Sequence, residues 1–432
     1  MIKKKIFTAI IPRNIGDIDF IFPLFEFLKK TNKGVNLNII YLSFSKYTIR
    51  KKDRLFEKSL KKMSIKEYDI IDLLKINISL KSKIRTYFNN DNYLTEDLNY
   101  YVNKKDFNIS KNLTYILKYL KIKIQQLFFF SIFFFFYDQK LLNKFKSDFY
   151  FVSQRNILST LLRNIFEKIV KFNPKSIFFL YPHGPHYINR TLESYGDTSK
   201  IIVNDSKNFE FWYSFNDEKP WMNKQLNLKK HKCNCVSYPF LKPKKKIRKK
   251  NKKKNILVIP RKFAPAHKKI LSSVGTTSYI EMIKYLKPLK NLQWNFNLII
   301  KPHPASNILE LKKMLKNLDI KNYSITEKSF RYIYKEIDLL YGYFSTLILS
   351  AVSSKIPVFY YEDEILKNCR AKIKKMYKDI TFFHFNNNNL EKKIVKTLKK
   401  NNYNNSKLNK YFKSSFLSLT SNRIKKNVQP TF

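Results

Sequence analysis

The sequence is short of glycine, cysteine and acidic residues. Its 432 residues include 6 Gly and 3 Cys, and 85 Lys and Arg outnumber 32 Asp and Glu, which gives a formal net charge of +53. Three cysteines cannot build a disulfide framework, and the pair Cys233 and Cys235 lacks the spacing of a standard zinc site. A reducing cytosol is therefore the expected compartment.

An excess of basic charge this large first suggests a nucleic-acid partner. The paucity of glycine, together with abundant Asn, Ile, Phe and Tyr, is instead typical of a lysine-biased, AT-rich genome. Most lysines are then solvated surface, and the remainder could hold an anionic membrane or an anionic polysaccharide. No specific nucleic-acid partner is expected, because the most basic run lacks interleaved aromatic residues.

That basic run marks a domain boundary. Ten of the thirteen residues in 242–254 are Lys or Arg, and such a segment cannot pack, so it is expected to be an exposed linker. The chain is also longer than a usual single domain. We predict an N-terminal acceptor-binding domain over 1–241 and a C-terminal nucleotide-binding domain over 255–432, which ends in a helical tail.

The N-terminal domain begins with a β-α-β pattern. Lys5–Ile11 is a predicted strand, 12–19 a loop, Phe20–Lys30 a helix and Val35–Leu42 a second strand. The apolar start breaks at Pro12, so it is interpreted as a strand and not as a signal peptide.

The loop after the first strand could contact an acceptor. Gly16 allows the backbone to approach a ligand closely, and we assign Arg13 and Asn14 to the same acceptor-binding role. Asp17 is a candidate general base. Acidic residues such as Asp17 and Asp19 are, however, more often partners of the helix dipole.

A run of aromatic residues covers 127–137. It is shorter than the roughly twenty apolar residues that span a bilayer, and extension back to Leu113 meets three lysines. One interpretation is a buried helix or strand. The other is a helix in the membrane interface, with lysines toward phosphates and phenylalanines toward acyl chains, which would make the protein a peripheral membrane protein.

Two histidines follow a predicted strand near Leu180. His183 and His186 lie in a loop stiffened by proline. No Cys, Asp or Glu lies nearby in the sequence to join the two histidines as a third metal ligand, so no metal site is expected. Either imidazole could deprotonate a sugar hydroxyl near neutral pH, with His183 preferred as the catalytic base. A structural role for both remains the alternative. Arg190 could neutralise an anionic acceptor.

The C-terminal domain opens with the predicted strand Asn255–Pro260. The helix Tyr279–Leu286 follows, and Ser278 with Glu281 has the spacing of a capping box. Backbone N–H groups just before this helix could bind a phosphate, as helix N-termini do. The residues that offer them are Gly275, Thr276 and Thr277.

The most informative stretch runs from Asn297 to Glu364. A strand ends in Lys301-Pro302-His303-Pro304, where two prolines hold the loop extended and stiff. A second strand ends near Gly342, and the hydroxyl pair Ser345 and Thr346 opens the next helix. Ligands of open α/β sheets bind outside the carboxyl ends of strands, so these loops are the predicted walls of one site.

The Lys-Pro-His-Pro loop, the Ser345-Thr346 pair and the segment "IDLLYGYFSTLILSAVSSKIPVFYY" resemble the nucleotide domain of bacterial GT-B transferases that build surface polysaccharides. The similar types are sialyl- and polysialyltransferases, capsule Kdo transferases and CDP-glycerol glycerophosphotransferases. The resemblance covers about residues 255 to 365 and implies an α/β GT-B fold of two Rossmann-like domains facing each other across a cleft.

The resemblance also implies a reaction. The HP histidine, His303, and the Ser/Thr pair would grip the phosphate and ribose of a CMP- or CDP-linked donor. His183 of the His-Gly pair, which is similar to the glycerophosphotransferase motif, would be the base. Lys301 would help to stabilise the leaving phosphate without a metal or other cofactor. The transfer would be a single inverting displacement to a glycan or lipid-linked acceptor.

Several alternatives stay open. The acidic Asp/Glu-Asp-Gly motif of sialyltransferases is absent, which weakens that particular assignment. A sugar-nucleotide epimerase shares the two-domain fold but needs several acidic groups in the first domain, where this sequence has few. A non-enzymatic basic protein that holds anionic polymer or membrane is the third possibility.

Overall fold

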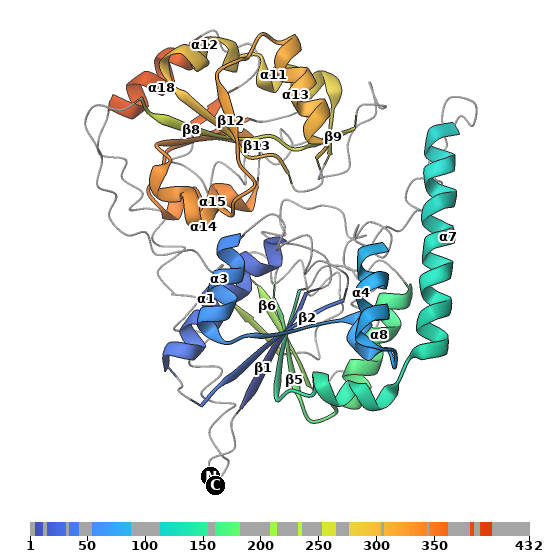
Figure 1. Cartoon of the computed structure of the whole chain (residues 1–432). Coiled ribbons are helices and arrows are strands. Elements are labelled where there is room, and N and C mark those ends of the chain that lie inside the picture. Colours follow the sequence, from blue (N-terminus) through green and yellow to red (C-terminus); the bar gives the residue numbers. More distant parts are fainter. Residues whose placement is uncertain are drawn as a thin grey trace. The chain divides into compact units, whose positions relative to one another are not determined.

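The computed structural model describes residues 5–11, 15–31, 34–42, 54–87, 113–153, 160–181, 208–213, 232–235, 253–264, 276–303, 306–343, 345–361, 381–383 and 389–399. These residues form two compact units, one up to Cys235 and one from Lys253 onward. Each unit has its own parallel sheet with helices on both faces (Figure 1). The basic residues 242–252 lie outside the described residues.

Unit 1, which ends at Cys235, is built on a seven-stranded sheet of order β3-β2-β1-β4-β5-β6-β7. All of its strand pairs are parallel. Its elements are β1 (Ile6–Ile11), α1 (Ile15–Thr31), β2 (Asn36–Tyr41), α3 (Arg54–Met63), β3 (Lys66–Asp69), η1 (Ile70–Leu73), α4 (Ile78–Tyr87), α7 (Leu113–Phe136), η2 (Gln139–Phe145), β4 (Phe149–Ser153), α8 (Thr160–Phe172), β5 (Ile177–Tyr181), β6 (Phe209–Tyr213) and β7 (Lys232–Cys235).

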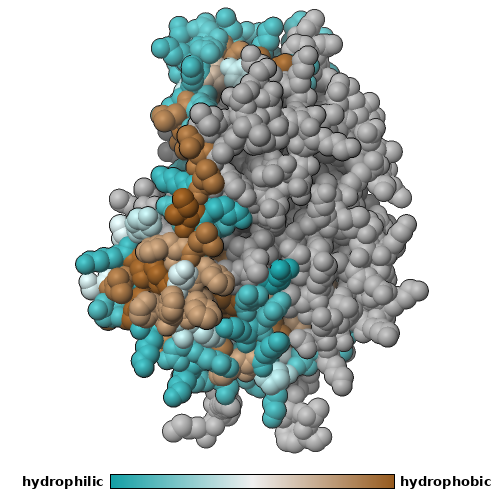
Figure 2. Space-filling view, turned by 90° about the vertical axis from the view of Figure 1, so that its right-hand side faces the viewer, coloured by the Kyte–Doolittle hydropathy of each residue, from teal (hydrophilic) through white to brown (hydrophobic). Residues whose placement is uncertain are grey.

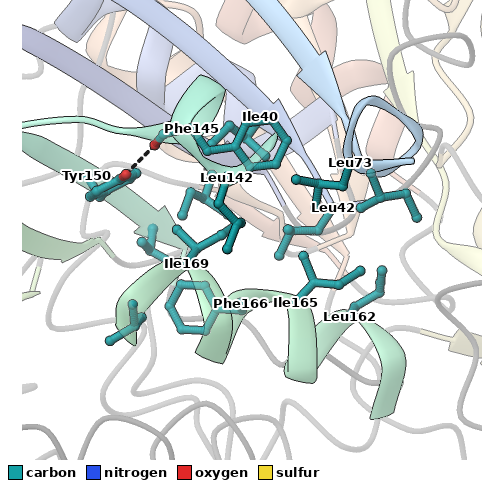
Figure 3. Close-up of a cluster of buried hydrophobic side chains, with 14 of the residues drawn as sticks. Ile40, Leu42, Leu73, Leu142, Phe145, Tyr150, Leu162, Ile165, Phe166 and Ile169 are labelled. Atoms are coloured by element: carbon teal, nitrogen blue, oxygen red, sulfur yellow. Dashed lines mark hydrogen bonds between the residues drawn. The ribbon is translucent and has the colours of Figure 1, made fainter. Parts of the chain in front are cut away.

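One layer of the core of unit 1 lies between the sheet and α8. Strands buried on both faces are nearly continuous apolar runs, which is why β1, β2 and β5 were predictable. The apolar side of α8 points at the sheet, and the hydroxyl of Tyr150 donates to the carbonyl of Phe145 in η2 (Figure 3). The side chains that meet there include Ile40, Leu42, Leu142, Leu162, Ile165, Phe166 and Ile169.

Unit 2, from Lys253 onward, repeats the architecture with a six-stranded sheet of order β12-β11-β8-β13-β14-β15, again parallel throughout. Its elements are β8 (Asn255–Ile259), β9 (Lys262–Ala264), β10 (Thr276–Ser278), α11 (Tyr279–Leu286), α12 (Leu289–Asn295), β11 (Asn297–Ile300), α13 (Ile308–Asn317), β12 (Tyr323–Ile325), α14 (Phe330–Ile333), η7 (Tyr334–Glu336), β13 (Leu339–Tyr343), α15 (Thr346–Ser353), β14 (Val358–Tyr361), β15 (Thr381–Phe383) and α18 (Leu390–Lys399).

The helices of unit 2 divide between the faces of its sheet. α11, α12, α13 and α18 cover one face, and α14 and α15 lie on the other (Figure 1). The helical tail over 390–399 belongs to this unit, because Leu390 and Ile394 are buried in its core. Numbered within the unit, the strand order is 3-2-1-4-5-6, and the first six strands of unit 1 have the same order. This is the doubly wound Rossmann order.

Two expectations about local structure need correction. The helix α1 begins at Ile15 and not at Phe20, so Gly16, Asp17 and Asp19 lie in its first turns and not in the preceding loop. Asp is favourable near a helix N-terminus, which extends the helix through residues that resemble a loop. The short edge strand β12 was also missed, since three residues carry too little periodicity to detect.

Candidate functional site at the carboxyl edge of unit 2

The strand order of unit 2 fixes where a ligand can bind. β8 is the first strand of the unit, and β11 and β13 pair with it on opposite sides, so the chain reverses its direction of winding at β8. In this fold, ligands bind at such a switch point, outside the carboxyl ends of the strands. Neighbouring strands lie about 4.8 Å apart, so the loops after β11 and β13 are about 10 Å apart at this edge.

The loop after β11 begins with Lys301. Its backbone N–H donates to the carbonyl of Val258 in β8 at 2.8 Å, which holds the start of the loop at the sheet edge. Pro302 is buried, whereas His303 is exposed and its carbonyl accepts from the N–H of Ser306 at 2.8 Å. The loop thus places His303 just beyond the end of β11 at the edge of the sheet, and its role in nucleotide binding stays a prediction. Pro304 lies outside the described residues.

The loop after β13 leads directly into α15. Ser345 is the N-cap residue, and its hydroxyl accepts from the N–H of Leu347 at 3.3 Å. This confirms that the hydroxyl pair opens a helix. The dipole of its first turn makes this helix start favourable for an anion, although the N–H groups of Leu347 and Ile348 already bond to Ser345. A serine hydroxyl that accepts a capping bond can still donate to a ligand. Thr346 is the first residue of α15, and its side chain is not among those described.

Arg261 supplies a cation between these two loops and was not singled out from the sequence. It follows β8 by two residues and is 8% exposed. Its guanidinium carbon lies 5.2 Å from the ring centre of Tyr343, which ends β13. An arginine keeps its charge at all ordinary pH values and presents a planar set of donors that suits phosphate. The one feature of the sequence that pointed to Arg261 was its position after Pro260, just beyond the first strand of the domain.

Two tyrosines tie the first turn of α11 to the same edge. The hydroxyl of Tyr343 donates to the backbone carbonyl of Glu281 at 3.1 Å. The hydroxyl of Tyr361, at the end of β14, donates to Oε2 of Glu281 at 3.1 Å, and Lys284 contacts Oε1 at 2.9 Å. The one carboxylate of α11 is therefore compensated by a cation and a hydroxyl.

Gly342 allows β8 and β13 to approach at this point. A Cβ atom on Gly342 would lie 1.9 Å from Cγ1 of Ile259, its partner in the strand register. The side chain of Ile259 therefore occupies the space that a Cβ would need. Only glycine fits against this isoleucine near the end of β13. Ser345, the N-cap residue of α15, follows three residues later.

The backbone N–H groups predicted to bind phosphate before α11 do not all lie in a loop. Thr276 and Thr277 form β10, which pairs in parallel with β9, instead of lying in a loop before α11. Part of their backbone hydrogen-bonding capacity is used in that pairing. The sequence signal was ambiguous because a three-residue strand and a polar loop look alike. Gly275 lies outside the described residues.

The predicted catalytic and acceptor residues of unit 1 are described only in part. Gly16 and Asp17 lie in α1, which follows the central strand β1, and their side chains are not described. His183, His186 and Arg190 follow β5, and Arg13 and Asn14 follow β1, but all five lie outside the described residues. The two strands before them, β1 and β5, are confirmed and flank β4. The roles of these residues stay predictions.

Among the described residues, no group of three His, Cys, Asp or Glu side chains lies close enough to hold a metal ion. Cys233 and Cys235 belong to β7, the last strand of the sheet of unit 1. The alternation of a strand places these two residues on one face of it.

Known proteins share this fold but not this sequence. No protein-family profile and no curated protein sequence matches the chain. A Listeria monocytogenes structure assigned as a UDP-N-acetylglucosamine 2-epimerase is 9% identical, with a TM-score of 0.54 over 99% of this chain and 98% of that one. The Neisseria meningitidis UDP-GlcNAc 2-epimerase bound to UDP-GlcNAc is 12% identical, with a TM-score of 0.51 over 98% and 100%.

A third structure, S. aureus MnaA with UDP, is 10% identical and has a TM-score of 0.52 over 98% of this chain and 97% of that one. At these identities the likeness concerns the fold alone. Together with the two parallel sheets of Rossmann order, it confirms the expected fold class, which is GT-B with two Rossmann-like domains.

Proposed function

We propose that the protein is a glycosyltransferase that uses a nucleotide-activated sugar. The observation that carries the proposal is the convergence of Arg261, the Lys301–His303 loop and the N-terminus of α15 on the switch point of unit 2. These groups are cations, donors and a helix dipole that lie at one edge of the sheet. Such an arrangement suits the phosphate of a nucleotide and stabilises the negative charge that grows on it as the sugar leaves.

The donor is proposed to be cytidine-linked, of the CMP-sialic acid or CMP-Kdo type. The Lys-Pro-His-Pro loop and the Ser345-Thr346 pair, which resemble those of transferases with such donors, support this choice. Arg261 and Lys301 provide positive charge at the leaving phosphate, which would remove the need for a divalent metal. The fold neighbours described with UDP or UDP-GlcNAc make a uridine donor the main competitor.

The acceptor is proposed to be a cell-surface glycan, in a capsule or a lipopolysaccharide, bound by unit 1. His183, with Asp17 and His186 as the alternatives, would take the proton of the acceptor hydroxyl in one inverting displacement. Arg13, Asn14, Gly16 and Arg190 would contact the acceptor. The reaction would take place in the cytoplasm, on the inner face of the cytoplasmic membrane. A glycerophosphotransferase with a CDP-glycerol donor would use the same phosphate site.

A sugar-nucleotide epimerase is a second candidate, because two of the proteins with this fold carry that description. Two acidic residues of unit 1 are already used in its structure. Asp69, at the end of β3, forms a pair of hydrogen bonds with Arg85 at 2.8 and 2.9 Å. Glu210 accepts from Trp212 at 2.9 Å and from Asn234 at 2.7 Å. These two carboxylates are engaged in structural contacts and are therefore poor candidates for the proton transfers of an epimerase.

The proposal is tested by a thermal-shift screen of the purified chain against CMP, CDP, UDP, GDP and dTDP, with and without EDTA. A ligand that binds only the folded state raises the melting temperature as its concentration exceeds its dissociation constant. We expect CMP or CDP alone to stabilise the protein, equally in EDTA, and His303→Ala to weaken the effect. Lys313→Ala, an exposed cation on α13, is the matched control and should leave the shift unchanged.

The other results of the thermal-shift screen would support different functions. A shift with UDP alone would keep the nucleotide site and overturn the cytidine donor. Incubation with UDP-GlcNAc in D2O then separates the two activities, because a 2-epimerase exchanges the C2 proton of the sugar whereas a transferase releases free nucleotide. The absence of a shift with every nucleotide would favour a basic protein that only binds anionic polymer.

A further inference from the structure

The helix α7 turns an apolar face toward solvent. It is 24 residues long, and its outward side is apolar as well as its buried side, unlike the usual amphipathic surface helix, whose outward side is polar. Phe134 is 72% exposed and Phe135 is 76% exposed. Figure 2 shows this surface as a brown band along α7 that widens at the phenylalanine-rich end. Among the described side chains of the helix, the exposed apolar ones are Leu117, Leu120, Ile124, Leu127, Phe128, Phe130, Phe134, Phe135 and Phe136.

The inner face of α7 is fixed to unit 1, so the outward face cannot simply turn inward. Phe129 and Phe133 are buried in the main core cluster. At the end of the helix, the carbonyl of Phe136 accepts from the N–H of Lys75 at 2.7 Å, and the N–H of Asp138 donates to the carbonyl of Leu73 at 3.0 Å. Among the described residues, the apolar stripe therefore lies on the outward side of the folded unit.

The helix α4 enlarges the apolar surface. Its last residue, Tyr87, packs against Phe128 of α7 with their ring centres 6.3 Å apart. Ile78 and Leu80, at the other end of α4, are also exposed. Soluble monomers rarely expose a contiguous apolar patch of this kind unless the patch binds something.

Basic residues border the apolar stripe. Lys121 stands three and four residues from Ile124 and Leu117, and Lys123 has the same spacing to Leu120 and Leu127, so the two lysines flank the stripe on opposite sides. The helix contains no Asp or Glu. Exposed lysines also stand on the neighbouring elements, at Lys83, Lys140 and Lys144.

We propose that α7 and α4 form a docking surface for an anionic lipid membrane. Phenylalanines and leucines would enter the boundary between headgroups and acyl chains, and the flanking lysines would meet lipid phosphates, as in helices that lie in the membrane plane. No helix in the described part of the chain is long and apolar enough to cross a bilayer, so the helix would lie on the membrane. Charge complementarity favours this occupant over a second copy of the chain, whose lysines would repel those of α7.

The inference is independent of the nucleotide site. A membrane-bound acceptor would explain why a transferase carries such a surface, but the docking itself needs no donor and no acceptor. It can therefore be measured in the absence of nucleotide, and a failure of either proposal would leave the other standing.

The experiment is co-flotation of the full chain with vesicles of phosphatidylcholine alone, and with vesicles that contain equal amounts of phosphatidylcholine and phosphatidylglycerol. We expect binding to the anionic vesicles, reduced by salt because the lysine contribution is screened. Phe134→Ser combined with Phe135→Ser should weaken this binding about tenfold or more, since two large apolar side chains no longer enter the lipid. Leu309→Ser, which changes a side chain 77% exposed in unit 2, should bind as the wild type does.

Two further variants separate a loss of docking from a loss of folding, and the apolar contribution from that of the lysines. Ile124→Ser alone should give a smaller loss, which covers the case in which the double variant does not fold. Lys121→Glu with Lys123→Glu should weaken binding to the anionic vesicles only. Unchanged binding by the folded double serine variant would overturn the proposal, because lysines elsewhere would then explain the affinity. Wild-type dimers that the double variant converts to monomers, without vesicle binding, would overturn it in favour of a second copy.

Discussion

The carboxylate of Asp338 accepts a hydrogen bond from the backbone N–H of Asn255 at 2.9 Å, and so clamps β13 to the first residue of β8. The N–H of Asp338 in turn donates to the carbonyl of Asn255, also at 2.9 Å. Unit 1 repeats the arrangement, since Asp148 accepts from the N–H of Ile6 at 2.8 Å. In both units the clamp joins the two strands of the switch point at their amino ends, opposite the edge where folds of this kind bind ligands.

Loss of the Asp338 clamp should loosen unit 2 alone. Asp338→Ala leaves the N–H of Asn255 without its carboxylate partner, at a cost of about 1–3 kcal/mol. Hydrogen–deuterium exchange should show reduced protection in β8 and β13, with β1 and β4 of unit 1 as the internal reference. Asp338→Asn keeps an acceptor of the same shape and should restore much of the protection. Equal loosening of both units would show that the clamp is not local.

Gly342 should tolerate no larger residue unless Ile259 is changed with it. The Cβ atom introduced by Gly342→Ala would lie 1.9 Å from Cγ1 and 2.7 Å from Cδ1 of Ile259, so strands or side chains must shift. Overpacking of this kind costs about 1–3 kcal/mol. Combining Gly342→Ala with Ile259→Ala removes both clashing atoms, and a double-mutant cycle measured by urea unfolding should show favourable coupling. Simple additivity of the two losses would contradict this account.

The sequence predicted the buried strands and the loops after them, because β8, β11 and β13 are apolar runs that need no partner to be recognised. It did not predict the edge strands β3 and β12, which are short and are defined by their pairing. Arg261 was missed for a related reason. Its importance follows from the central place of β8 in the sheet, and strand order is a long-range property that a single Pro-Arg pair does not reveal.

The buried tyrosines of unit 2 should make its stability fall at alkaline pH. Tyr285 and Tyr341 each donate a hydroxyl to the backbone carbonyl of the other, at 2.9 and 2.7 Å. Burial, and then the neighbouring tyrosines, raise the pKa of both hydroxyls well above the ordinary value. The folded protein thus keeps protons that the unfolded chain loses above about pH 10, so this contribution is complete below pH 10 and declines above it.

Tyrosinate absorbance measured during alkaline titration tests this prediction. Most of the 28 tyrosines should ionise first, and a late step should coincide with loss of tertiary structure. Tyr285→Phe should reduce the amplitude of the late step and flatten the dependence of stability on pH above 10 relative to the wild type. Comparison with Tyr87→Phe, an exposed tyrosine of α4, controls for the simple loss of one chromophore. Ionisation of all tyrosines in one early step would contradict the burial argument.

Arg261 should bind the phosphate of the nucleotide and not its base or ribose. Arg261→Ala removes a charged donor, and hydrogen bonds to charged groups contribute about 1.5–3 kcal/mol, so the dissociation constant for CMP should rise roughly 10- to 100-fold. Affinity for cytidine, which has no phosphate, should hardly change. Arg261→Lys keeps the charge but loses the planar set of donors and should recover only part of the affinity. Calorimetric titration of both ligands into each variant gives the comparison directly.

Because the guanidinium lies over the ring of Tyr343, each variant is first checked for an unchanged melting temperature without ligand. An equal loss for CMP and cytidine would mean that Arg261 shapes the pocket instead of holding the phosphate.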